Sequence, residues 1–443
     1  MGCIGTMLFA YACGEEPVED TTIEYVEEEL EPYVPIEPLG AVISYEVSPM
    51  RPRVLPDIYA YEPLADKKVI CIGELSDTSF RVIEEATGKN VYTGVLEKRG
   101  VDEVTGEQSY MGDFSGFTSE GTYHIQVAAI GESYPFEIRN GVYETLFATC
   151  ISNLDKLWAE DMSVAGLDLE EQAAGVHDIL IALEYYTELF SDDAGISQSG
   201  NGIPDALDLV GRYVEALRSA DVQSLSNKDL ACYVGTLAAA GHSYKNFDKN
   251  LSGEYLKAAE DGFHVLEKRS LVEDEQSYEF YAASELYRAD MQANCRTITE
   301  AYLTNMDHAA DMNRMTFYGV IAYVSCKYTV DTSLCSKVMS SLLFEVEKLC
   351  ALAEGEPFYV SSTSLQTECD NMTRIAIINY VITNHEYVIV QEHHLHYLLG
   401  RNPQGACYVD GFGRRMSQTV IDASPSGLGS TVLSLCEILL ENR

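Results

Sequence analysis

The stretch GNGIPDALD at residues 200–208 reads as a turn that leads into a helix. Glycine and asparagine tolerate the unusual backbone angles of a tight turn, and the proline at position 204 suits the first position of a helix. Asp205 and Asp208 then lie in the first turns, where the helix dipole favours negative charge. Two carboxylates at this spacing could also hold a metal ion. Because both belong to the start of the helix, we expect them to serve as capping residues.

Helical periodicity extends outward from this stretch over about 300 residues, from residue 140 to the C-terminus. Such a region must be a multilayer helical array, a solenoid or a closed toroid. We find no fixed-period repeat, which disfavours the solenoid. The segments with helical spacing of apolar residues are 142–159, 173–190, 204–219, 228–244, 252–268, 278–290, 314–328, 332–353, 371–384, 388–400 and 425–441.

Residues 39–139 have a different pattern, with short runs in which apolar and polar residues alternate. In GTYHIQV, Tyr123, Ile125 and Val127 alternate with polar residues, as in a strand with one buried face. Six or seven such strands in about 100 residues indicate an immunoglobulin-like β-sandwich. The clearest strand segments are 67–74, 79–85, 90–98, 121–129 and 133–138.

Residues 1–38 resemble a tether more than a folded domain. The short apolar stretch ends in Ala12-Cys13-Gly14, which resembles a lipoprotein cleavage box with Cys13 as the lipid anchor. The export signal is incomplete, because no Lys or Arg precedes that stretch, and a frayed N-terminus is the alternative. Residues 15–38 hold ten acidic residues, no basic ones and four prolines, a composition typical of an extended spacer.

The overall composition excludes several classes of partner. The chain has 443 residues and a net charge of −41, so it repels phosphate backbones and we expect no nucleic-acid partner. No run of about 18 apolar residues predicts a transmembrane segment. The twelve cysteines include no Cys-x-x-Cys pair, which argues against a zinc site, and most are expected to be free and to pack as small apolar residues.

Several strings together resemble glycoside hydrolase family 9. The helix start at 200–208 is similar to that family's NGIPD-x-LDE, and FYAASELYR at 280–288 is similar to its FWAAAELYR helix. The segment YLLGRNP at 397–403, with Tyr408-Val409 and GFG at 411–413, resembles its YxLGRNP…YVTGFG segment. The strand-rich region looks like the immunoglobulin-like module that precedes many of these catalytic domains. The resemblance implies an (α/α)6 barrel behind a β-sandwich, in enzymes that cut β-1,4-glucans with inversion.

The resemblance also exposes losses at the first catalytic motif. The family supplies its base from G-W-H/Y-D-A-G-D, and the matching text here is GVHDILI at 175–181. His177 and Asp178 match the first half, so Asp178 takes the auxiliary aspartate position. The A-G-D half with the base is absent, and Val176 replaces the motif tryptophan.

The second catalytic carboxyl is missing as well. The family's acid lies in N-E-V-x-I-[DN], which aligns with SQTVID at 417–422 and places Gln418 at the acid position. An amide cannot donate a proton as a carboxylic acid does. The family's histidine-rich substrate loop is reduced to Arg414, Arg415 and Met416.

The remaining candidates follow from the resemblance and from composition. We expect His177, Tyr408 and Arg414 to contact substrate. Trp158, the chain's one tryptophan, is expected to pack in the core, and the histidines at 393, 394 and 396 are expected at the surface or between helices because their spacing does not suit a metal site. No cofactor or metal ligand is assigned, and the resemblance leaves calcium open without a site.

These observations divide the chain into a signal remnant and spacer (1–38), an immunoglobulin-like sandwich (39–139) and a shortened family 9-like helical domain (140–443). Whether the chain is an enzyme stays open. We expect a catalytically inactive or severely impaired relative that binds β-glucan weakly at a bacterial cell surface or serves as an interaction module. The alternative is an active inverting endo-β-1,4-glucanase that uses Asp178 as base and Asp422 or Asp410 as a relocated acid.

Overall fold

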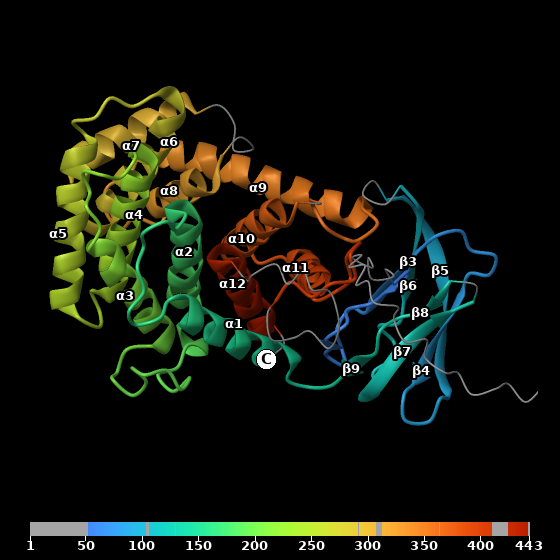
Figure 1. Cartoon of the computed structure of the whole chain (residues 1–443). Coiled ribbons are helices and arrows are strands. Elements are labelled where there is room, and N and C mark those ends of the chain that lie inside the picture. The colour runs from blue at the N-terminus through green and yellow to red at the C-terminus, as the bar shows by residue number, and fades with distance from the viewer. Residues whose placement is uncertain are drawn as a thin grey trace, which may run out of the picture. The chain divides into compact units, whose positions relative to one another are not determined.

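The computed structural model describes residues 52–102, 106–128, 130–290, 292–306, 312–362, 364–409 and 424–441 (Figure 1). The expected lipid anchor at Cys13 and the spacer lie outside the described residues. So do Asp410, Arg414, Gln418 and Asp422, which carry the expected substrate loop and acid positions.

The N-terminal part of the described chain is a β-sandwich. Its strands are β1 (Val54–Leu55), β2 (Ala60–Tyr61), β3 (Lys68–Ile72), β4 (Ser79–Glu84), β5 (Asn90–Val101), β6 (Gln108–Asp113), β7 (Gly121–Val127), β8 (Gly131–Glu132) and β9 (Phe136–Ile138). They pair in the order β1-β3-β6-β5-β4-β7-β9-β2, with β8 on β7. The long β5 pairs with β4 through its first half and with β6 through its second half, so it passes from one sheet to the other.

Alternation along the strands builds the core of the sandwich. Tyr123, Ile125 and Val127 of β7 are buried, as their period of two predicts. The ring of Phe80 fills the centre and lies against the backbone of Gly94 and Gly112, where an added Cβ would come within 2.3 and 2.5 Å of it. The two glycines therefore allow the strands on either side to close over a large aromatic ring.

The rest of the described chain is helical, with one 3₁₀ turn. The helices are α1 (Val142–Leu157), α2 (Leu169–Tyr185), the 3₁₀ helix η1 (Thr187–Leu189), α3 (Asp205–Arg218), α4 (Asn227–Tyr244), α5 (Lys249–Leu266), α6 (Glu273–Asp290), α7 (Ala293–Asn305), α8 (Arg314–Val324), α9 (Thr332–Gly355), α10 (Leu365–Val381), α11 (His385–Leu398) and α12 (Pro425–Glu441). Within the described residues, none of these helices has both the length and the hydropathy that crossing a bilayer requires.

The even-numbered helices form an inner layer and the odd-numbered helices pack outside them. Neighbouring inner helices contact one another from α2 through α4 and α6 to α8, and α12 packs on both α2 and α10. The text AAGVHDILIAL in α2 is buried on all sides, whereas α5 buries only one face. This alternation of inner and outer helices is the arrangement expected of an (α/α)6 barrel (Figure 1).

Among the described elements, the two-residue strands β1, β2 and β8, the longer strand β6 and the helix α7 lie outside the predicted segments. The helix α7 buries only Cys295, Thr299 and Leu303, so its apolar period is weak. The strand β6 is buried mainly through Gln108, Ser109 and Tyr110. Because two of these residues are polar, they lack the apolar pattern that predicts a buried strand. Helix α2 also starts four residues before its expected position, because Asp168 caps it by accepting hydrogen bonds from the amides of Glu170 and Glu171.

The three C-terminal histidines of α11 are buried, so the surface location left open by the sequence is wrong. His396 Nδ1 lies 2.8 Å from Asp57 Oδ2, and His393 Nε2 lies 3.2 Å from Asp66 Oδ2, so both contact the chain segments before β3. His394 faces α10 instead. Burial lowers the pKa of His393 to about 4. Neutral histidines therefore fasten α11 to the sandwich at neutral pH.

Candidate functional site

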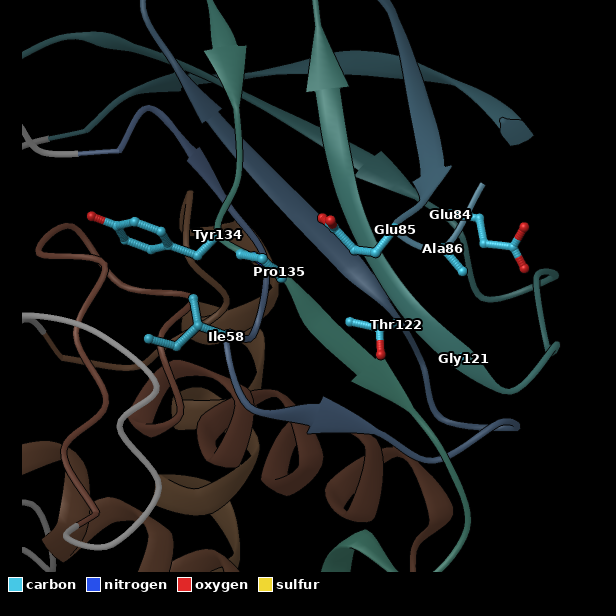
Figure 2. Close-up of a pocket in the computed structure, with 8 residues that line it drawn as sticks. All are labelled: Ile58, Glu84, Glu85, Ala86, Gly121, Thr122, Tyr134 and Pro135. Atoms are coloured by element: carbon cyan, nitrogen blue, oxygen red, sulfur yellow. The ribbon is translucent and has the colours of Figure 1, made fainter. Parts of the chain in front are cut away.

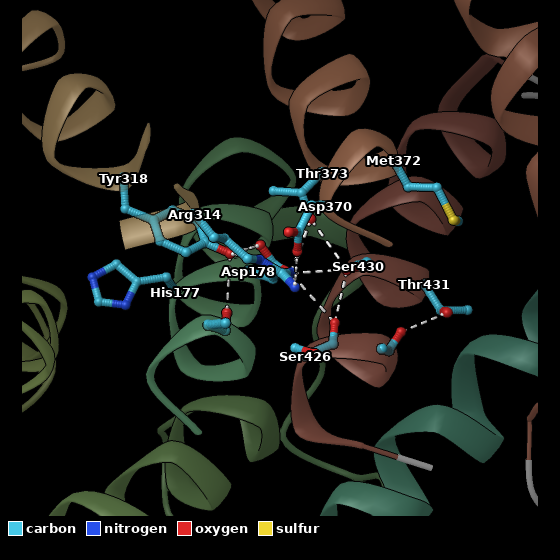
Figure 3. A network of polar contacts seen from close by, with 12 residues as sticks. His177, Asp178, Arg314, Tyr318, Asp370, Met372, Thr373, Ser426, Ser430 and Thr431 are labelled. Carbon is cyan, nitrogen blue, oxygen red and sulfur yellow. Dashed lines mark hydrogen bonds and ion pairs between the residues drawn. The ribbon is translucent and has the colours of Figure 1, made fainter. Parts of the chain in front are cut away.

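Asp178, the residue at the auxiliary aspartate position, lies in the middle of α2 and is fully buried. Its Oδ1 accepts a hydrogen bond from the Tyr318 hydroxyl at 2.5 Å. Its Oδ2 pairs with the Arg314 guanidinium and accepts from Thr373 Oγ1 at 3.1 Å and Ser430 Oγ at 3.3 Å. Figure 3 shows that these partners reach Asp178 from α8, α10 and α12. Both carboxylate oxygens are thus held by donors from three other helices.

Arg314 is the hub of this network and begins α8. Its Nε donates to the Tyr318 hydroxyl at 2.8 Å, and its Nη1 donates to Asp370 Oδ1 at 3.0 Å. Its Nη2 pairs with Asp178 and donates to Ser430 Oγ at 2.9 Å. Because every guanidinium nitrogen has an acceptor, the buried charge is compensated on all sides.

The electrostatics of the pair follow from burial and proximity. Burial raises the pKa of the Asp178 carboxyl, and the Arg314 guanidinium opposes that rise. Burial likewise opposes the charge on Arg314, but Asp178 and its other neighbours together hold the pKa of Arg314 well above its ordinary value. The guanidinium therefore keeps its proton, and Asp178 is held as the anion of a buried ion pair.

His177, the expected substrate contact next to Asp178, points to different partners. Its Nδ1 donates to the Ala173 carbonyl oxygen at 2.8 Å, and its Nε2 lies 3.2 Å from Glu285 Oε1. Its ring stacks on Tyr318 with centroids 4.8 Å apart. With 2% of its surface exposed, His177 packs inside the barrel, where a polymeric ligand has no access.

Close packing of α2 on α12 seals the barrel around Asp178. A Cβ on Gly175 of α2 would lie 2.5 Å from the Pro425 carbonyl oxygen. A Cβ on Gly429 of α12 would lie 2.9 Å from the Asp178 Cβ and 3.0 Å from the Gly175 carbonyl oxygen. The two glycines bring the helix backbones into contact, which leaves no room for a water molecule at this crossing.

An accessible pocket of about 340 Å³ lies where the first turns of α2, α10 and α12 meet. Its lining includes the half-buried Glu171 of α2, Gln366 of α10 and Tyr408. Glu171 Oε1 accepts from the Ser426 amide at 3.1 Å, which holds its carboxylate in place. Asp370 and Arg314 lie between Gln366 and Asp178, since Gln366 Nε2 donates to Asp370 at 3.3 Å. Asp178 is therefore separated from the pocket by a layer of paired side chains.

A larger cavity, of about 550 Å³, lies on the sandwich (Figure 2). It is lined by Ile58, by the end of β4 and the start of β7, and by Tyr134 and Pro135. One of its carboxylates, Glu85, is paired with His124 at 2.6 Å. The lining includes none of the expected site residues, so the pocket at the helix starts is the better candidate site.

The structure brings together only part of the expected site. His177 and Asp178 lie inside the barrel, Tyr408 lines the pocket, and Arg414 and Gln418 fall outside the described residues. Sequence reasoning missed Arg314 and Glu171. The string NRM at 313–315 contains no motif that predicts a buried arginine. The sequence identifies Glu171 only as an acidic residue in the first turn of a helix.

Two residues near the start of α3 also differ from expectation. Asp205 and Asp208 do not cap their own helix, whose N-cap is Pro204 without a side-chain hydrogen bond. Asp205 Oδ2 accepts from Ser199 Oγ at 2.8 Å and from the amide of Ala194 at 2.5 Å, while Asp208 accepts from Asn201 Nδ2. The side chains turn toward the preceding loop because that loop folds back over the helix start. Trp158 is buried and stacks on Tyr213, as expected of a core residue.

Comparisons with known proteins agree on both halves of the chain. Residues 51–132 match the family model described as the cellulase N-terminal ig-like domain, and residues 211–428 match that of glycosyl hydrolase family 9. A cellodextrinase of Butyrivibrio fibrisolvens is 38% identical over 82 residues, which are 18% of this chain and 14% of that protein. Endoglucanase D of Acetivibrio thermocellus is 39% identical over 74 residues, 17% of this chain and 12% of that protein. The matched stretches thus span far less than two thirds of these relatives.

Solved structures resemble the whole described fold. A metagenome-derived glycoside hydrolase family 9 endoglucanase superimposes with a TM-score of 0.73 at 17% identity, covering 87% of this chain and 98% of that one. A single-mutant thermostable endoglucanase from Alicyclobacillus acidocaldarius gives a TM-score of 0.70 at 17% identity, covering 88% and 100%. At this identity the likeness shows the fold, and it confirms the expected sandwich followed by an (α/α)6 barrel.

Proposed function

This chain belongs to glycosyl hydrolase family 9 and carries an N-terminal immunoglobulin-like domain, and from that membership we propose that it binds β-glucan without hydrolysing it. The observation that carries the proposal is the pairing of Asp178 with Arg314 inside the barrel. A catalytic base must hold a water molecule against the sugar, and this carboxylate is neither free nor reachable.

The chemistry of inversion explains why that observation supports the proposal. An inverting glycosidase needs one carboxylate to activate water and one carboxylic acid to protonate the leaving oxygen, roughly 6.5–9.5 Å apart. The sequence offers Asp178 for the first role and places the amide of Gln418 in the second. General acid or base catalysis each contributes roughly 10²–10⁴-fold, so loss of both removes most of the rate enhancement.

The pocket at the helix starts supports retained glycan binding. Tyr408 offers an aromatic ring, which can pack against the apolar face of a pyranose. Glu171 and Gln366 offer a carboxylate and an amide for hydroxyl groups. A volume of about 340 Å³ lies at the small end of the range for ligand sites and suits one or two sugar units. The ligand would therefore be bound weakly and locally, with no extended cleft required.

We propose that the protein acts outside the cell. We also propose that the spacer, the sandwich and the helical domain meet at about residues 38 and 139. A polymeric glucan does not cross a membrane, so a binding protein must meet it outside. The acidic spacer suits a position held away from a surface. The Asp178–Arg314 pair argues against the alternative in which Asp178 is the base of an active endoglucanase, and that alternative becomes an outcome of the test.

The test measures hydrolysis and binding on the same protein. Reducing-end release from a soluble β-1,4-glucan is compared for the wild type and Asp178→Asn. Binding of cello-oligosaccharides is measured by calorimetry for the wild type, Glu171→Gln and Tyr408→Ala. Tyr380→Ala is the matched control, since Tyr380 is 47% exposed and is not part of the pocket lining.

We expect no release above the Asp178→Asn background. We expect binding that weakens at least tenfold in both pocket variants and is unchanged in the control. Release by the wild type that disappears in Asp178→Asn would establish an active enzyme and overturn the proposal. Absence of binding by the wild type, or equal loss in Tyr380→Ala, would overturn the assigned glycan site.

A further inference from the structure

The cavity on the sandwich has an apolar side and an acidic side, and we propose that it binds a short saccharide that carries a primary ammonium group. Its volume of about 550 Å³ lies within the range of about 300–1,000 Å³ for small-molecule sites. Ile58, Tyr134 and Pro135 line the apolar side, and Glu84 and Glu85 at the end of β4 line the acidic side (Figure 2). The ligand would be an oligomer of the glucosamine class.

The backbone holds the apolar side in place. The amide of Ile58 donates to the Leu399 carbonyl oxygen at 3.1 Å, which ties this residue to the end of α11. Ser133 Oγ donates to the Tyr134 carbonyl oxygen at 2.8 Å and accepts from the amide of Ile125 at 2.9 Å. The aromatic ring is therefore carried by a fixed segment, which lowers the entropic cost of binding a ligand.

The apolar side suits a pyranose ring. Tyr134 and Pro135 are each partly exposed, so a ligand can reach them. An aromatic ring beside aliphatic groups favours the C–H face of a sugar. Thr122 of β7 is also partly exposed and lines the same cavity with a hydroxyl that can both donate and accept. A sugar matches both kinds of surface, because its faces are apolar and its edge carries hydroxyl groups.

The carboxylate of Glu85 faces this apolar side. Figure 2 shows its oxygens on the side of Pro135 and Tyr134, whereas the side chain of Glu84 points away from them. His124 Nδ1 lies 2.6 Å from Glu85 Oε1. Because a carboxylate only accepts hydrogen bonds, the imidazole is the donor in this contact. The contact occupies Oε1 and leaves Oε2 of Glu85 as an acceptor for a ligand.

The charge of the cavity favours an ammonium group over a neutral hydroxyl. In the described parts of the chain, no lysine or arginine pairs with Glu84 or Glu85, and none lines the cavity. A neutral imidazole can donate to Glu85 without compensating its charge. The net charge of −41 also attracts cations from a distance. A charged donor makes a stronger hydrogen bond to a carboxylate than a neutral one, so an amino sugar should be preferred over glucose.

The experiment compares three ligands that differ at a single position of the sugar ring. The β-1,4-linked trimers of glucosamine, N-acetylglucosamine and glucose are titrated into the full chain by calorimetry. At about pH 6 the amine carries a proton, since an α-amino group has a pKa of about 7.7–8.0. The titrations are repeated at higher salt concentration, and a lysine tripeptide serves as a cation without a sugar ring.

Four variants locate the site. Glu85→Gln removes the charge, Tyr134→Ala removes the ring, and Tyr134→Phe keeps the ring. Glu97→Gln is the matched control, because it removes the same charge from an exposed position of β5 that does not line the cavity. The cavity shares no lining residue with the pocket at the helix starts, so Glu171→Gln distinguishes this site from the proposed glucan site.

We expect the glucosamine trimer to bind at least tenfold more tightly than the other two trimers and less tightly as salt is added. Its affinity should fall at least tenfold in Glu85→Gln and Tyr134→Ala and stay within twofold in Tyr134→Phe, Glu97→Gln and Glu171→Gln. If Tyr134→Ala does not fold, Glu85→Gln alone decides the result.

No binding of the glucosamine trimer, equal affinity for the three trimers, or equal loss in Glu97→Gln would overturn the proposal. Tighter binding of the lysine tripeptide would overturn the saccharide as the ligand. Loss of binding in Glu171→Gln but not in Glu85→Gln would place the ligand at the helix starts and overturn the sandwich site. Failure of the proposed glucan binding leaves these outcomes unchanged, because the two sites are tested with different ligands and variants.

Discussion

The buried carboxylates at the centre of the barrel and in the loop before α3 differ in their partners. Asp178 receives a guanidinium and three hydroxyl groups, so both of its oxygens are occupied. At the loop, Asp205 keeps one buried oxygen without a partner and has two further carboxylates beside it. Arg314 compensates the negative charge of Asp178, whereas the aspartates at the loop carry excess negative charge.

The difference shows which carboxylates can still bind a ligand or take part in a reaction. A carboxylate whose lone pairs are all taken stabilises the fold and has nothing left for water or substrate. A carboxylate with a spare lone pair still has an oxygen that can accept a hydrogen bond. Family membership alone would direct attention to the barrel centre, whereas the contacts point to the pocket at Glu171.

The sharpest way to break this comparison is Arg314→Met, which would make the barrel centre resemble the loop. Without the guanidinium, Asp178 would be a buried charge with no cation, and removal of one partner of such a pair costs about 3–5 kcal/mol. We expect a loss of this size in the free energy of unfolding measured with urea at pH 7. The exposed pair of Arg218 and Glu254 provides the control, since Arg218→Met should cost less than about 1 kcal/mol.

A double variant tests whether the missing guanidinium destabilises the protein because it leaves the charge of Asp178 buried without a partner. Arg314→Met combined with Asp178→Asn removes both charges, so part of the lost stability should return. If Arg314→Met alone lowers the free energy of unfolding by less than about 1 kcal/mol, Asp178 does not depend on the guanidinium. The comparison between the two sites is then wrong.

A smaller effect tests whether packing as well as charge closes this region. A Cβ on Gly175 would meet the Pro425 carbonyl oxygen at 2.5 Å, so Gly175→Ala should push α2 from α12 and cost about 1–3 kcal/mol. Gly253→Ala is the control, since Gly253 lies in α5 with no neighbour within 4 Å of an added Cβ. That change should instead stabilise by up to about 1 kcal/mol, because alanine favours helix. Equal effects in urea unfolding would show that the crossing is not tightly packed.

Glu368 offers a third case, a buried carboxyl beside a neutral histidine. Burial raises the pKa of Glu368 to about 8, and burial lowers the pKa of His394, 3.1 Å away, to about 3. The folded state therefore holds a proton on Glu368 that the unfolded state releases near pH 4.5. The stabilising contribution is complete below that pH and is lost as the pH rises through 8.

The measurement is the free energy of unfolding between pH 5 and 8 for the wild type and Glu368→Gln. Relative to the variant, the wild type should lose stability with rising pH, by at most about 1.4 kcal/mol per pH unit. The amide variant lacks this titration and serves as its own baseline. Parallel curves for the two proteins would mean that Glu368 ionises normally and that no special partner is needed there.

Sequence patterns predicted most of the architecture. The period of α10 and α12 and the alternation in β7 gave the right element type because burial on one side or all sides imposes those periods. They missed α7, whose buried face holds only three residues, and the surface option for the α11 histidines was wrong. Spacing along a helix does not reveal that a second domain covers it.

The candidate site was predicted only in part. His177, Asp178 and Tyr408 could be selected because they match family motifs. The predicted absence of the base, and the predicted position of Gln418 in place of the acid, come from the same alignment and stay predictions. The environment of these residues could not be predicted. Arg314 is 136 residues from Asp178 in the chain, and no local pattern connects them.

The sequence by itself determined the family and the order of sandwich and barrel, because these depend on residue identity and on local periodicity. The loss of the family's acid and base residues stays a prediction from the same alignment. Tertiary structure alone decided that Asp178 is sealed by Arg314, that Glu171 faces an open pocket, and that Asp192, Asp205 and Asp208 converge. Electrostatic energy depends on distances between side chains in space, and folding sets those distances between residues far apart in the chain.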